Sequence, residues 1–147
     1  MKVFLDTNVL ASAAATRGLC ADVLREVLAS HDLFISEQIL TEFKNVLGLK
    51  FGVSQDLIDD FIWLLQRDTV LAQPAELPNV PIQDKDDLPI LGAAIAAGAD
   101  VLVTGDKELL KLGHIEDVKI LSPRQFWEKL RARQQRRARR AKQRRSR

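Results

Sequence analysis

The segment Lys2-Val3-Phe4-Leu5-Asp6-Thr7-Asn8 places a short apolar run directly before three polar residues. An apolar run of this length with an abrupt polar end is typical of a buried strand followed by a loop. The segment therefore predicts a strand over residues 2–5 and a loop after it. It also predicts a carboxylate, that of Asp6, at the point where the strand ends.

Strands alternate with helices along the rest of the chain. Further apolar runs predict four more strands, over residues 33–35, 69–72, 101–104 and 119–121. Apolar residues at helical spacing predict helices between them, over residues 20–30, 37–48, 54–65 and 90–97 and from 123 onward. Because the strands are continuously apolar, we predict a parallel sheet with helices on both faces, a three-layer α/β sandwich.

Acidic residues come just after these strands or just before a helix. In such folds ligands bind beyond the carboxyl ends of the strands, where the strand order reverses. Asp6 and Asp106 each follow a strand, so both carboxylates are expected at the same edge of the sheet. Asp87 opens the alanine-rich helix and follows closely on Asp84 and Asp86.

The acid at position 42 lies on a predicted helix, and every acid also has a structural interpretation. Glu42 shares a helical face with the apolar residue Ile39, whereas a solvated glutamate would more often lie opposite such residues. Asp6 can also be read as a turn residue, residues 84–87 as a solvated loop with a helix cap, and Asp106 as part of a turn. Their joint placement favours a shared site.

Carboxylates gathered in one cleft repel each other unless a cation neutralises them or they take up protons. Oxygen ligands of this kind suit Mg²⁺ or Mn²⁺, which bind carboxylates, water and substrate phosphate. Such ions can activate water for the hydrolysis of a phosphodiester bond. The acidic residues therefore point to metal-dependent chemistry on phosphates.

Four motifs occur in order: Val3-Phe4-Leu5-Asp6-Thr7-Asn8-Val9-Leu10, Ser36-Glu37-Gln38-Ile39-Leu40-Thr41-Glu42-Phe43, Asp84-Lys85-Asp86-Asp87 and Gly98-Ala99-Asp100-Val101-Leu102-Val103-Thr104-Gly105-Asp106. Each motif is short, but as a set they resemble a PIN domain, and the resemblance covers about residues 1–127 in order. They are most similar to the toxin components of bacterial toxin–antitoxin pairs, relatives of the VapC-like toxins.

The resemblance implies a five-stranded parallel sheet, dependence on Mg²⁺ or Mn²⁺, and endoribonuclease activity on RNA. By position it assigns the metal-binding catalytic carboxylates to Asp6, Glu42, Asp87 and Asp106, and supporting roles to Asn8, Thr104, Asp84 and Asp86. The acidic run leaves open which of its residues is the main ligand. A cognate antitoxin that covers the cleft and a homodimer are compatible with the resemblance, but no residue of the chain predicts either.

The end of the chain differs sharply in charge from the rest. Residues 131–147 contain ten Lys or Arg residues and no acid, which leaves 12 basic and 20 acidic residues in positions 1–130, a net charge of −8. We therefore separate a PIN-like nuclease domain, residues 1–127, from a basic C-terminal helix or tail, residues 128–147. Such a block is either a solvated appendage or an arm that binds nucleic-acid phosphates through residues such as Arg136, Arg137, Arg139 and Arg140.

Several other function classes lack the residues that they need. Two histidines are too few for the usual zinc site, and no phosphate-binding loop, serine-hydrolase elbow or Cys-x-x-Cys pair occurs. The chain has one cysteine, no apolar run long enough to span a bilayer, and no signal-peptide pattern at its start. We therefore expect a protein of the cytoplasm that does not enter a membrane.

Two alternatives to a nuclease remain at this point. The first is a non-catalytic RNA-binding or partner-binding module with a PIN-like fold, against which the full set of acids argues. The second is a signalling receiver domain, which pairs acids after its first strand and has a lysine after its last. Here Asp6 has no adjacent acid and Lys119 begins the last predicted strand, so the receiver pattern fits poorly.

Overall fold

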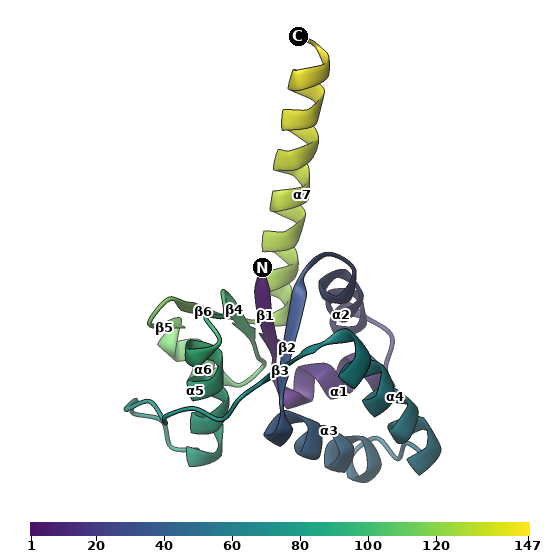
Figure 1. Cartoon of the computed structure of the whole chain (residues 1–147), viewed down its shortest axis with the longest axis vertical. Coiled ribbons are helices and arrows are strands. Elements are labelled where there is room, and N and C mark those ends of the chain that lie inside the picture. Colours follow the sequence, from purple (N-terminus) through teal and green to yellow (C-terminus); the bar gives the residue numbers. More distant parts are fainter.

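The computed structural model describes residues 1–147 and contains a six-stranded sheet flanked by helices (Figure 1). The strands are β1 (Lys2–Leu5), β2 (Asp32–Ser36), β3 (Val70–Ala72), β4 (Val101–Val103), β5 (His114–Ile115) and β6 (Val118–Leu121). They lie in the order β3-β2-β1-β4-β6-β5. Neighbouring strands are parallel except at the edge, where β5 runs antiparallel to β6.

The strand predicted at the start of the chain lies at the centre of the sheet. Val3, Phe4 and Leu5 are buried, and β1 pairs with β2 on one side and with β4 on the other. From β1 the chain extends the sheet one way through β2 and β3, then crosses back and extends it the other way through β4 and β6. The carboxyl ends of β1 and β4 therefore form the topological switch point, where ligands of such sheets bind.

Helices cover both faces of the sheet, which confirms the predicted three-layer α/β sandwich. They are α1 (Thr7–Ala15), α2 (Leu19–Ser30), α3 (Glu37–Leu49), α4 (Gln55–Asp68), α5 (Leu88–Ala96), α6 (Lys107–Leu112) and α7 (Pro123–Arg145), with one turn of 3-10 helix at Lys85–Asp87. Helices α1 to α4 lie on one side of the sheet and α5 and α6 on the other (Figure 1). Right-handed crossovers require this arrangement, because the direction of winding reverses at β1.

The loop predicted directly after β1 is wrong. Asp6 is the residue that precedes α1, and Thr7 and Asn8 form the first turn of that helix. Polar side chains are favourable at the start of a helix, where backbone amides lack partners, and the alanines that follow are strong helix formers. The polar triplet therefore marks a direct passage from strand to helix.

Two short elements were not predicted. The sheet has six strands, one more than the resemblance implies, because the two-residue strand β5 folds back onto β6. Helix α6 contains only six residues. Neither element is long enough to produce a detectable hydrophobic period, so the sequence pattern could not indicate them.

Helix α7 is the longest helix and projects away from the body of the protein (Figure 1). It begins at a capping box formed by Ser122 and Gln125, as the sequence predicts. Phe126 and Leu130 are buried and fix its base to the body. The sequence left the extent of this helix open, and in the structure it continues to Arg145. No helix of the protein combines the length and the apolar character that crossing a membrane requires.

Helix α5 approaches the preceding loop closely at Gly92. A Cβ atom at this position would lie 2.4 Å from the carbonyl oxygen of Glu76 and 3.5 Å from Cδ of Pro78. Real Cβ atoms do not tolerate the first of these distances, so the loop packs on α5 only because residue 92 is glycine. This contact helps to place the chain that continues into the acidic run at residues 84–87.

Replacing Gly92 with alanine is expected to destabilise the fold by about 1–3 kcal/mol, because the loop or the helix must move. Gly48→Ala in α3 is the matched control, since its new Cβ would meet only Cδ1 of Ile58 at an ordinary 3.7 Å. Alanine's higher helix propensity should stabilise that variant by up to about 1 kcal/mol. Urea unfolding of both proteins measures the difference, and equal stabilities would contradict the close approach.

Candidate active site

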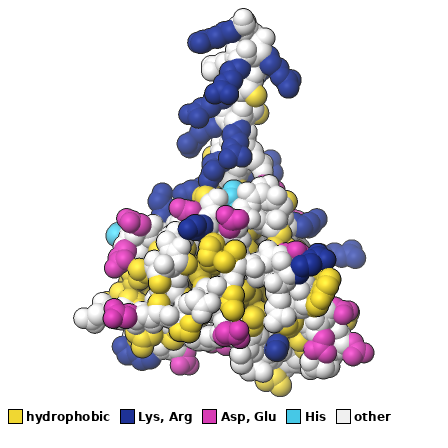
Figure 2. All heavy atoms as spheres, in the orientation of Figure 1, with side chains coloured by type: hydrophobic (Ala, Val, Ile, Leu, Met, Phe, Trp, Pro, Cys, Tyr) yellow, Lys and Arg dark blue, Asp and Glu magenta, His cyan; other side chains and the backbone are white.

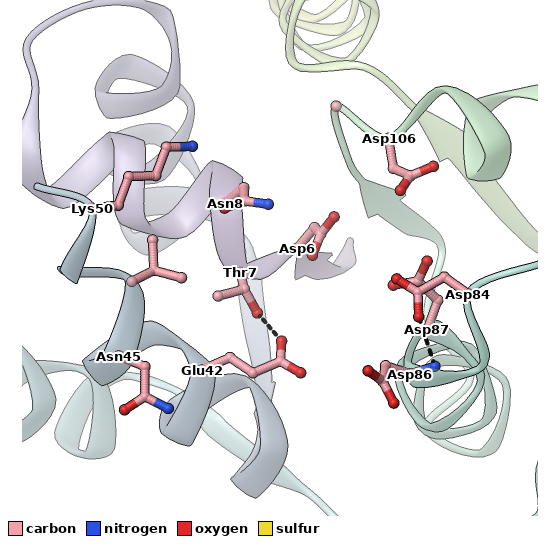
Figure 3. Close-up of a pocket in the computed structure, with 12 residues that line it drawn as sticks. Asp6, Thr7, Asn8, Glu42, Asn45, Lys50, Asp84, Asp86, Asp87 and Asp106 are labelled. Atoms are coloured by element: carbon pink, nitrogen blue, oxygen red, sulfur yellow. Dashed lines mark hydrogen bonds between the residues drawn. The ribbon is translucent and has the colours of Figure 1, made fainter. Parts of the chain in front are cut away.

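A polar pocket of about 530 Å³ opens at the switch point of the sheet. Figure 3 shows Glu42 on one side of it, the acidic run 84–87 on the other, and Asp6 between them. Val46 is the only hydrophobic residue of its lining, and Lys50 is the only cationic one. The pocket brings together all the acids that the sequence singled out, Asp6, Glu42, Asp84, Asp86, Asp87 and Asp106, as well as Asn8.

The carboxylate of Asp6 accepts a hydrogen bond from the residue that directly follows the neighbouring strand β4. Oγ1 of Thr104, a fully buried residue, donates a 2.7 Å hydrogen bond to Oδ2 of Asp6. Asp6 makes no side-chain capping bond to α1, so helix capping does not explain it. Burial raises the pKa of Asp6, the bond from Thr104 lowers it by less, and the carboxylates of Glu42 and Asp106 raise it further.

Glu42 is held at both of its carboxylate oxygens. Oγ1 of Thr7 donates to Oε2 at 2.8 Å, and Nε2 of Gln38 donates to Oε1 at 2.9 Å. Gln38 also donates to the carbonyl oxygen of Asp86 at 2.9 Å and so links α3 to the acidic run. Neither donor was predicted from the sequence. Gln38 lies four residues before Glu42 on the same helix face and could have been found, whereas the contact of Thr7 joins two helices and left no local signal.

The acidic run separates into two kinds of carboxylate. Oδ1 of Asp84 accepts a bond from the amide of Asp86 at 3.0 Å, so a local capping role explains Asp84. Asp87 stands before the first turn of α5 and makes no side-chain capping bond. Burial, followed by repulsion from Asp84 and Asp6, raises the pKa of Asp87 to about 7. Asp87 is therefore a carboxylate of the run whose charged form the pocket disfavours.

Asp106 combines a structural contact with a place in the pocket. Its Oδ1 accepts bonds from the amides of Glu108 at 2.8 Å and Leu109 at 3.2 Å, which caps α6. Its own amide donates to Oγ1 of Thr104 at 3.0 Å, the same oxygen whose hydrogen points to Asp6. Thr104 thus joins the residues that follow β1 and β4 into one hydrogen-bonded unit.

The donor set of the pocket suits a hard divalent cation. Six carboxylates line it, and no histidine or cysteine does, which is the chemistry that Mg²⁺ or Mn²⁺ prefers. In the arrangement described, no three acidic side chains are gathered closely enough to hold an ion. Burial, and then repulsion from the neighbouring carboxylates, raises the pKa of Asp87, and a bound cation would offset both effects. The residues therefore fit a cation in donor type and charge.

The arginines predicted to bind nucleic acid lie far from this pocket. Arg136, Arg137, Arg139 and Arg140 are exposed on the outer part of α7 and are absent from the pocket lining. At the base of that part, Nε2 of Gln134 donates to Oε1 of Glu26 on α2 at 3.0 Å. The helix leaves the body near the start of β1, whereas the pocket lies at the other end of that strand (Figure 1). Within one molecule, α7 therefore supplies no side chain to the pocket.

The model of the PIN-domain family matches residues 2–108 of the chain. The chain belongs to this family. The match includes the positions of all four predicted metal-binding acids and ends before α7 begins, so the basic helix lies outside the matched region.

Two solved structures are similar in fold to this PIN domain. One is VapBC2 from Rickettsia felis bound to a DNA fragment from their promoter, with 20% identity and a TM-score of 0.54, over 82% of this chain and 97% of that chain. The other is VapBC-1 from nontypeable Haemophilus influenzae, with 22% identity and a TM-score of 0.58, over 84% of this chain and 98% of that chain. At these identities the likeness concerns the fold. No curated protein matches the chain.

Without a metal ion, the PIN domain is expected to lose stability as the pH rises from about 4 to about 7. The pKa of Asp87 is raised in the folded protein from 3.8 to about 7, so in this window the folded state holds a proton that the unfolded state has released. The free energy of unfolding therefore falls with rising pH. Asp6 contributes in the same direction, because its pKa is also raised.

The variant Asp87→Asn should remove most of this dependence. In EDTA the Tm of this variant should lie a few degrees above that of the wild type near pH 8, since each kcal/mol of added stability raises Tm by about 2–4 °C. Near pH 4 the two Tm values should be close. Solvent screening limits the effect, since Asp87 is only half-buried. Asp60→Asn, on the exposed surface of α4, serves as the control. A gain in Tm of the same size at both pH values would contradict the prediction.

Proposed function

We propose that this PIN domain is a divalent-metal-dependent endoribonuclease that hydrolyses phosphodiester bonds in RNA. The observation that carries the proposal is the crowding of six carboxylates from separate segments around one pocket, with the pKa of Asp87 raised to about 7. Perturbed acids in a cleft are typical of functional sites. The side chains that would hold Mg²⁺ or Mn²⁺ are those of Asp6, Glu42, Asp87 and Asp106.

A divalent ion in such a site polarises phosphate oxygens and lowers the pKa of a bound water. The chain's own residues would prepare the site for it. Thr104 fixes one oxygen of Asp6, while Thr7 and Gln38 fix both oxygens of Glu42. Acceptors that are oriented in advance need little reorganisation when positive charge arrives. Lys50, the only cationic side chain of the lining, would attract the phosphate of the substrate.

The biological setting that we propose is that of the toxin in a toxin–antitoxin pair, acting on RNA in the cytoplasm. This rests on the similarity in fold to the VapBC proteins, which extends over nearly the whole of the matched chains. The partner would be a cognate antitoxin that covers the acidic pocket. A homodimer is compatible with this setting, and no contact within the chain requires one.

A non-catalytic RNA-binding module with the same fold is the second candidate. The observation that favours it is the spread of the carboxylates, of which no three are close enough to hold an ion. Against it stands the pocket itself. An acidic pocket repels RNA phosphates, so a module selected only for binding would gain nothing from six carboxylates.

Cleavage of a mixed-sequence RNA by the purified protein in Mg²⁺ separates the two candidates. The wild type should cleave, EDTA should abolish cleavage, and Asp6→Asn should reduce the rate by at least about 100-fold, the effect of losing one electrostatic group from an active site. Asp60→Asn, outside the pocket, should cleave as the wild type does. If wild type and Asp6→Asn bind RNA and neither cleaves it, the protein is a binding module; equal cleavage by both would place the activity elsewhere.

The variant Thr104→Val tests the role of the hydrogen bond that Thr104 donates to Asp6. The substitution keeps the shape of a fully buried side chain but removes the hydroxyl that donates to Oδ2 of Asp6. Activity should fall by about 10–100-fold, as is usual when a group that orients a metal ligand is lost. The acidic limb of the pH–rate profile should also move to higher pH, because the lost bond lowered the pKa of Asp6.

Thr41→Val is the matched control for Thr104→Val. This threonine is exposed on α3, and its hydroxyl bonds only the carbonyl oxygen of Glu37 in the same helix. Its rate and its pH profile should both equal those of the wild type. A fall in the rate of Thr104→Val without any shift of the profile would mean that Thr104 acts through the fold alone.

A further inference from the structure

The part of α7 that extends beyond the body carries many positive charges and no negative one. Residues 131–147 include ten Lys or Arg residues and no Asp or Glu. Every residue from 134 to 147 is exposed, and Figure 2 shows Lys and Arg side chains along the projecting helix without an acidic one. The two salt bridges of the molecule, Arg25 with Asp22 and Arg67 with Asp68, lie elsewhere. These charges therefore have no partner within the protein.

Five arginines lie along one side of α7, and Arg147, two residues past its end, lies beside them; we call this set the arginine face. At 3.6 residues per turn, their positions fall within an arc of about 100°. Arg140, Arg144 and Arg147, with Gln143, line a shallow hollow on this side of the helix. The arginine face consists of Arg133, Arg136, Arg137, Arg140, Arg144 and Arg147. Of the four arginines predicted from sequence to bind nucleic acid, Arg139 alone lies off this face.

The arginine face is electrostatically unfavourable as it stands. Arg136 and Arg140, and Arg140 and Arg144, are pairs four residues apart and lie one above the other on the helix. Like charges at this spacing destabilise a helix, and no acidic side chain intervenes to relieve them. A bound polyanion would remove the repulsion and stabilise the outer turns of α7.

The composition of α7 identifies the class of polyanion. Residues 131–147 contain no apolar side chain larger than alanine. A helix that lies on a membrane needs a face of large apolar residues, and a protein partner usually needs aromatic or aliphatic anchors. Nine of the ten cations are arginines, whose planar guanidinium groups form bidentate hydrogen bonds with phosphate oxygens.

We propose that the arginine face of α7 is a second nucleic-acid site, which binds the phosphate backbone without reading sequence and works independently of the acidic pocket. The face runs from Arg133 to Arg147, which is 14 steps of about 1.5 Å, and is thus about 21 Å long. Phosphates follow one another at about 3.4 Å along a strand, so it can cover about six of them. Because α7 leaves the body at the end remote from the pocket, its contacts are separate from those of the proposed nuclease site (Figure 1).

The test measures binding with the full chain carrying Asp6→Asn, in EDTA, so that its result does not depend on the nuclease proposal. Fluorescence anisotropy across a KCl series follows binding to a short single-stranded RNA and to a DNA duplex with the same number of phosphates. The face variant combines Arg136→Gln, Arg137→Gln, Arg140→Gln and Arg144→Gln. The slope of log K against log [KCl] should become shallower by about 3–4, since each lost phosphate contact removes about 0.7–0.9 from it.

The charge-matched control combines Arg131→Gln, Arg139→Gln, Lys142→Gln and Arg145→Gln on the other side of the helix. It should change the slope by less than about 1. Circular dichroism should report more helix when RNA is added to the parent protein and no such gain for the face variant. If both variants made the salt slope shallower by the same amount, the proposal that the arginine face is the binding site would be wrong. Tighter binding to polyglutamate or to anionic lipid vesicles than to either nucleic acid would overturn the choice of partner.

Discussion

Repulsion among the carboxylates at the ends of β1 and β4 is the constraint on which the rest of the site depends. The parallel sheet brings these ends together because β1 is central and β4 is its neighbour. The protein does not relieve the repulsion with internal salt bridges at the pocket, since the two that it has lie on α2 and α4. Instead, hydroxyl and amide donors orient both oxygens of Glu42 and one oxygen of Asp6. Such a site is stable only when protons or a cation complete it.

Most of the fold was predictable from the sequence, because buried parallel strands leave a strong signal. The runs at residues 3–5 and 101–103 are continuously apolar and lie side by side in the centre of the sheet, where both faces are covered. The helix at residues 7–15 was missed since its polar first turn resembles a loop. Strand β5 and helix α6 were missed because two and six residues are too few to establish a period.

The acids of the candidate site were predictable from the sequence, but the hydrogen bonds that orient them were not. Asp6 and Asp106 were expected at one edge of the sheet, and the pocket contains both. The donors that orient the acids could not be predicted in the same way, because Thr7 reaches Glu42 across two helices. Residues that share a pocket through topology alone, such as Lys50, have no sequence spacing that would reveal them. The extent of α7 was equally hidden, since a run of arginines fits both a solvated tail and a helix.

The acidic pocket and the basic helix also differ in how far their charges act. Helix α7 has 23 residues and is about 34 Å long, whereas salt at physiological strength screens exposed charges beyond about 8 Å. The base of α7 is packed in the body as far as Leu130, and the last turns of the helix lie about 20 Å beyond it, more than two screening lengths away. Their arginines cannot neutralise the pocket, and the pocket cannot weaken their attraction for an anion. Local positive charge in the pocket must then come from within reach of its carboxylates, and Lys50 alone is too little for six of them.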